Sequence, residues 1–148
     1  MRFVRFETET RDMYGIVDGE TVLEINNSPI GKEYEETGKV YKLDSLKILS
    51  PNPKPGKMLC LALNYETHLL GAEKPSRPEP FYKNSNAVIG PGDPIILPSD
   101  AGLVVCESEL VAIIGKKASK VSESDALEHV FGYTCGNDVS AREWQSGA

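Results

Sequence analysis

The chain lacks the features that would direct it to a membrane or to a nucleic acid. Its 148 residues contain no apolar run close to the roughly 18 residues that cross a bilayer. The opening residues, MRFVRFETET, contain no apolar stretch of signal-peptide length. Acidic residues outnumber basic ones by 22 to 16, and a net charge of −6 does not favour the phosphate backbone of DNA or RNA. We therefore expect neither a membrane nor a nucleic acid among its partners.

Cysteine is scarce as well. The chain has three cysteines, Cys60, Cys106 and Cys135, which are far apart and odd in number. Such a set is typical of reduced thiols and not of a disulfide framework. No two of them form a Cys-x-x-Cys pair, which argues against a zinc site. The expected location is the reducing cytoplasm.

What the chain does contain is typical of a globular protein in two parts. Its hydrophobic fraction of 40% and charged fraction of 26% are ordinary for a soluble domain with a small appendage. Residues 1–50 predict a small β unit, in which Asp18-Gly19 between two apolar runs indicates a hairpin with a type I′ turn. Residues 51–57 carry prolines at alternate positions and predict an extended linker. Residues 58–148 would then form the larger domain.

The larger domain is organised around residues 103–115, which read LVVCESELVAIIG. Their β-branched and aliphatic side chains predict an interior strand. Side chains two apart on a strand share a face, so Glu107 and Glu109 lie together on a face that is apolar at its ends. Two neighbouring like charges in such a place need compensation. A divalent cation would supply it, as would a Lys or Arg partner or a strand end that reaches water.

A histidine follows an earlier predicted strand, residues 58–63. His68 would sit on about two turns of helix that Asn64 caps and Gly71 ends. Strand ends collect functional side chains in α/β proteins, and histidine suits general-base catalysis near neutral pH. A lone histidine is, however, more often a structural residue, and both interpretations stay open on this segment alone.

An acid, a cation and an amide follow the strand at residues 133–135. Asp138 lies at the end of that strand, with Arg142 and Gln145 four and seven residues further on. If the segment is helical, the three side chains share one face. They could simply be a salt bridge and a surface residue, or they could line a pocket for an anionic substrate.

Two further elements are expected from local patterns. Residues 95–97, after dense turn punctuation, predict a strand. Residues 122–131 predict a helix, because Ser122 and Asp125 resemble a capping box and Gly132 would end the helix. That helix would be structural.

Three groups of residues, taken in order, resemble the fumarylacetoacetate hydrolase family. They are LNYETH at residues 63–68, a stretch from FYK through SNAVIGPGDPI to ESEL at residues 81–110, and GYT followed by NDVSAR at residues 132–142. Each group alone is weakly specific, whereas the three together in this order are quite specific. The resemblance covers roughly residues 58–145 of the chain.

The resemblance implies a fold, a metal and a reaction. The fold would be α+β and mostly β, with a mixed β-roll core domain after a small N-terminal β unit. Glu107, Glu109 and Asp138 would bind Mg²⁺ or Mn²⁺, ions that suit all-oxygen ligation. His68 would help to activate water, and Arg142 and Gln145 would lie near the substrate. The implied reaction is C–C bond hydrolysis, decarboxylation or keto-enol isomerisation of a small 2-oxo or 2,4-diketo acid, and a homodimer is expected.

Two departures from the family pattern leave an alternative open. Many hydrolytic members carry a Glu three residues after the His, and this chain has Gly71 there. This favours isomerisation or decarboxylation over water activation by a His–Glu pair. Relatives also continue past the metal-binding Asp, whereas this sequence ends at Ala148. The alternative is a truncated, non-catalytic protein that keeps the fold, with or without the metal site.

Overall fold

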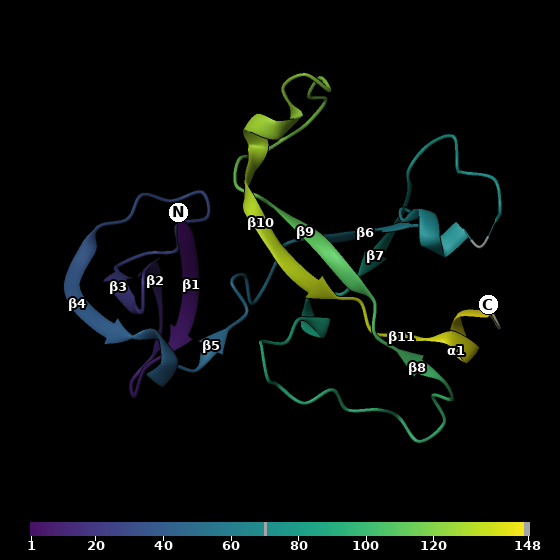
Figure 1. Ribbon diagram of the computed structural model, residues 1–148. Helices are drawn as coiled ribbons and strands as arrows, with labels where there is room; N and C mark the ends of the chain where they lie inside the picture. The colour runs from purple at the N-terminus through teal and green to yellow at the C-terminus, as the bar shows by residue number, and fades with distance from the viewer. Residues whose placement is uncertain (70, 147–148) are drawn as a thin grey trace. The chain divides into compact units, whose positions relative to one another are not determined.

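The computed structural model describes residues 1–69 and 71–146 and is built mostly of β-strands (Figure 1). The predicted fold class, α+β and mostly β, is confirmed. The chain divides into two compact units, one made of Met1–Leu23 and Val40–Asp93 and the other of Glu24–Lys39 and Pro94–Ala148. No helix within the described ranges is long and apolar enough to cross a membrane.

The N-terminal strands form one five-stranded sheet, with its strands in the order β4-β3-β2-β1-β5 (Figure 1). The strands are β1 (Arg2–Glu7), β2 (Asp12–Asp18), β3 (Thr21–Ile25), β4 (Glu36–Lys42) and β5 (Ile48–Leu49), and a 3-10 helix, η1 (Leu43–Ser45), follows β4. Phe6, Met13 and Val22 are buried and form the core, and the ring of Tyr41 lies 5.2 Å from that of Phe6. Alternating apolar residues on β1 and β2 thus supply one packed face.

The predicted hairpin is present, but its turn differs from the expected type. Asp18 ends β2 and Thr21 begins β3, so the two turn residues are Gly19 and Glu20. Gly19 has a φ of +56°, whereas Glu20 has no positive φ. A positive φ at the first central residue alone fits a type II′ turn, for which glycine is the usual residue.

Gly15 should not tolerate a side chain, because a Cβ there would collide with Cγ1 of buried Val22 and lie 2.9 Å from the carbonyl oxygen of Leu23. Overpacking of this kind costs about 1–3 kcal/mol. We expect Gly15→Ala to lower the free energy of unfolding by that amount in urea denaturation. Gly56→Ala is the control, since its Cβ would meet nothing within 4 Å. Equal stabilities of the two variants would contradict this packing.

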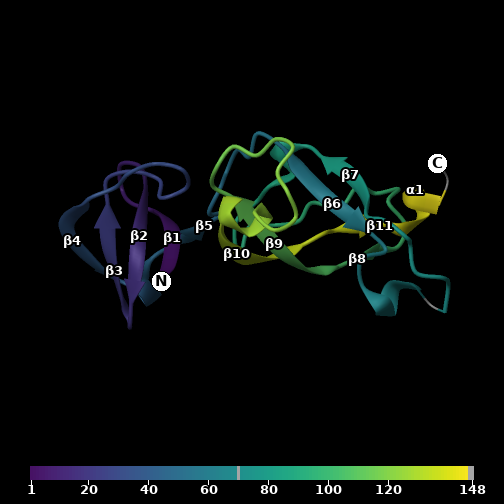
Figure 2. The ribbon, with the colours of Figure 1, turned by 90° about the horizontal axis from the view of Figure 1, so that it is seen from above.

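The unit made of Met1–Leu23 and Val40–Asp93 also contains a two-stranded sheet, in which β6 (Met58–Ala62) pairs antiparallel with β7 (Glu79–Lys83) (Figure 2). A 3-10 helix, η2 (Glu66–Leu69), follows β6, and another, η3 (Ser85–Ala87), follows β7. The prediction of about two helical turns after β6 is wrong. The His68 N–H donates to the Tyr65 carbonyl three residues back, which is the tighter 3-10 pattern. Leu70, in the predicted helix, lies outside the described residues.

The other unit contains the two short ladders that carry most of the predicted site. β9 (Ser108–Ile114) pairs antiparallel with β10 (Val130–Asn137), and β8 (Val104–Val105) pairs antiparallel with β11 (Ser140–Ala141). The α-helix α1 (Arg142–Ser146) follows β11 directly. Figure 1 shows β9 and β10 side by side.

Three expectations for this unit are wrong. The strand predicted over residues 103–115 is interrupted, and β9 pairs with β10 alone among the described strands, so it is not interior. Leu110 and Ile114 on it are 68% and 56% exposed. Apolar periodicity identified a face that can be buried, but it does not show which element covers that face. Residues 95–97 form no strand. The helix predicted over residues 122–131 is one 3-10 turn, η4 (Ala126–His129), because β10 already begins at Val130.

Ser122 and Ser124 form hydrogen bonds with the carboxylate of Asp125 and do not cap the helix backbone. Asp125 is the N-cap residue of η4, and no side-chain hydrogen bond caps the turn. Ser124 Oγ instead donates to Oδ1 of Asp125 over 3.0 Å. Hydrogen bonds from Ser122 and Ser124 hold the pKa of the Asp125 carboxyl below its usual range.

Candidate functional site

Glu107 lies where one ladder gives way to the other. β8 ends at Val105 and β9 begins at Ser108, while on the facing segment β10 ends at Asn137 and β11 begins at Ser140. Both segments therefore change partner at the same level. The backbone N–H of Asp138 donates to the carbonyl of Glu107 over 2.8 Å. Two of the three predicted carboxylate ligands are thus opposite each other at this junction.

Glu109 is close to the same junction, on β9. It is half-buried and pairs in register with Gly136 on β10. Glu107 is half-buried too, but it lies between strands, so the strict alternation that predicted a shared face does not apply between the two. What brings both near Asp138 is the antiparallel register of β9 with β10.

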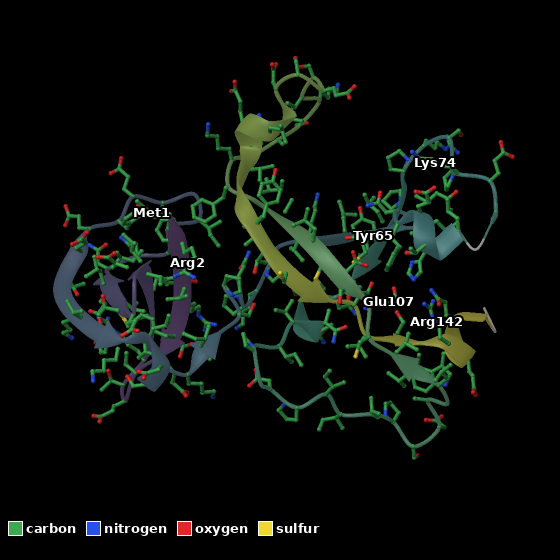
Figure 3. All side chains as sticks on the ribbon, viewed as in Figure 1. Met1, Arg2, Tyr65, Lys74, Glu107 and Arg142 are labelled. Atoms are coloured by element: carbon green, nitrogen blue, oxygen red, sulfur yellow. The ribbon has the colours of Figure 1, made fainter. Side chains whose placement is uncertain are left out.

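Arg142 compensates the charge of Glu107. Its Nη2 lies 2.8 Å from Oε1 of Glu107, and Figure 3 labels both residues. The Glu107 side chain is 13% exposed and that of Arg142 is 38% exposed. Oε1 of Glu107 is shielded from solvent and accepts no well-aligned hydrogen bond from the described residues, so this contact is an ion pair without hydrogen-bond geometry. Among the alternatives of a cation, a Lys or Arg partner and a strand end in water, the structure shows an arginine partner for Glu107.

Gln145 joins the same group of side chains through Arg142. Nη1 of Arg142 donates to Oε1 of Gln145 over 2.9 Å, and both residues lie on α1. Asp138 precedes β11 and is not helical, so the predicted common helical face holds for Arg142 and Gln145 only. The start of α1 is fixed by two further hydrogen bonds, from the Arg142 N–H to the Leu103 carbonyl and from Trp144 Nε1 to the Asp100 carbonyl.

His68 belongs to the other unit, where its side chain is exposed on η2. Its participation in the site therefore stays a prediction. Gly71 has a φ of +89°, a left-handed conformation that a residue with a side chain rarely adopts. The backbone at Gly71 therefore disfavours a side chain at the position where the family resemblance implies a Glu.

The three predicted carboxylate ligands together offer the kind of donor atom that a hard divalent cation prefers. Glu107, Glu109 and Asp138 offer only oxygen ligands, which suit Mg²⁺ or Mn²⁺ and not Zn²⁺. Oε1 of Glu107 is shielded from solvent and ion-paired with Arg142, and such an ion could replace the arginine as its partner. As the side chains stand, no three His, Cys, Asp or Glu residues within the described ranges converge closely enough to hold an ion.

Sequence reasoning missed Asn137. Its Oδ1 accepts the backbone N–H of Glu107 over 3.0 Å. The signal that could have identified it is its place, directly before Asp138 at a strand end, where an Asn side chain often bonds to nearby backbone.

Gly136 lets β10 pack closely against Val111 of β9. A Cβ at this glycine would lie 2.7 Å from Cγ2 of Val111 and 3.7 Å from Cβ of Glu109. We expect Gly136→Ala to destabilise the β9–β10 ladder by about 1 kcal/mol in urea denaturation, because β-branched Val111 has few other rotamers. Gly132→Ala, on the same strand, is the control, since its Cβ would meet nothing within 4 Å. A smaller loss for Gly136→Ala than for Gly132→Ala would refute this assignment.

Two family models match the chain, one over each end. The model described as Fumarylacetoacetate (FAA) hydrolase C-terminal matches residues 57–148, and the model described as Rv2993c-like, N-terminal matches residues 1–51. The chain is 50% identical over 105 residues to a fumarylacetoacetate hydrolase domain-containing protein 2 homolog of Dictyostelium discoideum, a match to 70% of this chain and 34% of that protein. It is 36% identical over 129 residues to a mitochondrial oxaloacetate tautomerase of Xenopus laevis, a match to 86% of this chain and 39% of the relative.

Solved structures are similar over nearly the whole chain. A 2-hydroxyhepta-2,4-diene-1,7-dioate isomerase from Mycobacterium marinum matches with a TM-score of 0.86 and 33% identity, over 99% of this chain and 57% of that one. A maleylpyruvate hydrolase from Sphingobium sp. SYK-6, in complex with manganese(II) ion and pyruvate, matches with a TM-score of 0.73 and 26% identity, over 94% and 58%. The chain thus spans well under two thirds of each of these four proteins.

Proposed function

The chain belongs to the fumarylacetoacetate hydrolase family, and on that premise we propose that it is a divalent-metal-dependent enzyme acting on a small 2-oxo or 2,4-diketo acid. The observation that carries the proposal is the pairing of Glu107 with two partners. Its backbone is bonded to Asp138, and its shielded carboxylate is paired with Arg142. An anionic cluster with one adjacent arginine suits a cation and a carboxylate substrate together.

The roles of the residues follow from their chemistry. Glu107, Glu109 and Asp138 would hold Mg²⁺ or Mn²⁺, in keeping with the manganese(II) complex of the related maleylpyruvate hydrolase. Bound by these residues, such an ion would supply Lewis-acid chemistry at the oxo group of the substrate.

Arg142 and Gln145 are proposed to bind and orient the carboxylate of the substrate. An arginine forms two parallel hydrogen bonds with a carboxylate, and the contact with Gln145 limits the orientation of the guanidinium. His68 is proposed to move a proton at the carbon next to the oxo group.

Among the three reactions, keto-enol isomerisation is the one that we propose. Gly71 removes the Glu that hydrolytic members pair with the His, and its φ of +89° disfavours a side chain there. Isomerisation needs proton transfer but no activated water. The names of an oxaloacetate tautomerase and an isomerase among the similar proteins are in keeping with this choice.

The test compares two reactions on the same preparation. Tautomerisation of a 2-oxo dicarboxylic acid is followed by the ultraviolet absorbance of its enol, and hydrolysis of a 2,4-diketo acid is followed by loss of the diketone. We expect the first to depend on Mg²⁺ or Mn²⁺ and to disappear in Glu109→Ala, while Glu128→Ala, an exposed carboxylate on η4, behaves as the parent. Undiminished activity in Glu109→Ala or in excess chelator would refute the proposal.

A non-catalytic protein is the second candidate. It is favoured by Gly71, which stands where the family resemblance implies a Glu in hydrolytic members. Metal binding without turnover of either substrate would support it. The homodimer that the family resemblance implies and the cytoplasmic location that the cysteines suggest stay predictions.

A further inference from the structure

We propose that Asn137 is a positioning residue that holds Glu107 opposite Asp138 and so sets the affinity of the carboxylate cluster for its divalent cation. The inference rests on the proposed function, in which both acids are metal ligands. Asn137 itself need touch neither the metal nor the substrate, because it acts through the backbone of Glu107.

The hydrogen bonds of this segment depart from a regular antiparallel ladder at one residue pair. In the β9–β10 register Asn137 faces Ser108, so Asp138 is the next residue to face Glu107. The Asp138 N–H donates to the Glu107 carbonyl over 2.8 Å, as in a hydrogen-bonded antiparallel pair. A regular pair would return a bond from the Glu107 N–H to the Asp138 carbonyl.

The side chain of Asn137 takes over that second bond. The Glu107 N–H donates to Oδ1 of Asn137 over 3.0 Å, and the Asp138 carbonyl accepts instead from the Ser140 hydroxyl at 3.5 Å. Asn137 Oδ1 therefore stands in for a backbone carbonyl where the ladder opens. The opening lets the facing segments change from the β9–β10 ladder to the β8–β11 ladder, and it coincides with two of the carboxylates.

An amide suits this position better than an acid. An aspartate would keep the acceptor but add a fourth negative charge close in register to Glu107, Glu109 and Asp138, which the cluster would have to compensate. An alanine would remove the acceptor and leave the Glu107 N–H to solvent. Glu107 lies outside a strand and would then keep only the bond from Asp138 and its side-chain ion pair.

The expected effect follows from what outer partners of metal ligands contribute. Removing such a partner lowers metal affinity by about 10–100-fold. We expect the Kd for Mn²⁺ to rise about tenfold in Asn137→Ala, at the low end of that range, because a single backbone bond is lost. Asn137→Asp keeps the acceptor and adds a negative charge, so its Kd should be no higher than that of the parent. Asn26→Ala is the matched control, since its Oδ1 accepts the Glu35 N–H over 2.9 Å in another loop.

The experiment combines two measurements on the full chain. Calorimetric titration with MnCl₂ gives the Kd, and amide hydrogen exchange by NMR without metal reports the Glu107 N–H directly. The proposal expects slow exchange at Glu107 in the parent and in Asn137→Asp, and fast exchange with weakened binding in Asn137→Ala. If Asn137→Ala does not fold, Asn137→Gln, which shifts the acceptor by one methylene, carries the same test.

The other outcomes separate this inference from the proposed function. Slow exchange at Glu107 or parent-like Mn²⁺ affinity in Asn137→Ala overturns the positioning role and leaves the metal-dependent enzyme standing. No Mn²⁺ binding by the parent overturns the proposed function, and with it the inference.

Discussion

Asp138→Asn is expected to lower the affinity of the chain for Mn²⁺ by more than about a hundredfold, because even the outer partners of metal ligands contribute 10–100-fold. The substitution keeps the size and shape of the side chain and the backbone bond from residue 138 to Glu107. It removes one of three negative charges and one strong oxygen donor. Any metal-dependent activity should fall at least as much as metal occupancy does.

The measurement is a Mn²⁺ titration of Asp138→Asn, with the fold checked by circular dichroism. Asp100→Asn is the control, because Asp100 is an exposed aspartate of the same unit whose carbonyl, not its side chain, contacts Trp144. Equal affinities in the Asp138 variant and the parent would exclude Asp138 as a ligand.

Arg142→Gln is expected to move metal and substrate binding in opposite directions. Without metal, Nη2 of Arg142 holds the Glu107 oxygen that a cation would use. A partly exposed ion pair of this kind contributes about 0.2–1 kcal/mol, so its loss should tighten Mn²⁺ binding by up to about fivefold. A hydrogen bond to a charged group contributes about 1.5–3 kcal/mol, so the KM for the oxo acid should rise by about 10–150-fold.

The opposite signs make the Arg142 result diagnostic. Calorimetry with MnCl₂ measures the first effect, and steady-state kinetics at saturating metal measure the second. Arg142→Lys is the companion variant, because it keeps the charge but loses the planar fork that binds a carboxylate with two bonds. A parallel loss of metal and substrate affinity in Arg142→Gln would indicate that Arg142 supports the fold instead of exchanging partners.

The sequence predicted candidate site residues, and the structure places Glu107, Glu109 and Asp138 on or beside one antiparallel ladder. Glu107 and Glu109 stood out because acids are costly in an apolar strand, and Asp138 because it follows a strand end. The register of β9 with β10 then brings Glu107 opposite Asp138, a long-range pairing that no local pattern encodes. The ion pair of Glu107 with Arg142 was one of several open alternatives.

The elements that failed were those that depend on packing. The helix predicted over residues 122–131 is one 3-10 turn, because short helices are marginally stable without a packed face. The apolar residues after His129 belong to β10, which begins at Val130. The central strand was predicted to be interior, yet Leu110 is 68% exposed. Apolar periodicity reports that a face can be buried, and the neighbouring element decides whether it is.

Asn137 illustrates a third limit. Asparagine before an acid at a strand end has many possible partners, and only the opened ladder reveals that it bonds to the Glu107 N–H. Its role depends on the absence of one regular backbone bond, which sequence patterns do not record.

The most direct test of the account is a titration of Mg²⁺ and Mn²⁺ into the purified chain, followed by thermal unfolding, with Glu109→Ala in parallel. A ligand that binds only the native state raises its stability by about 2.7 kcal/mol at a hundredfold excess over Kd. The account predicts such a rise in the parent and its loss in Glu109→Ala. No rise in the parent, or an equal rise in both, would contradict a metal site built from Glu107, Glu109 and Asp138.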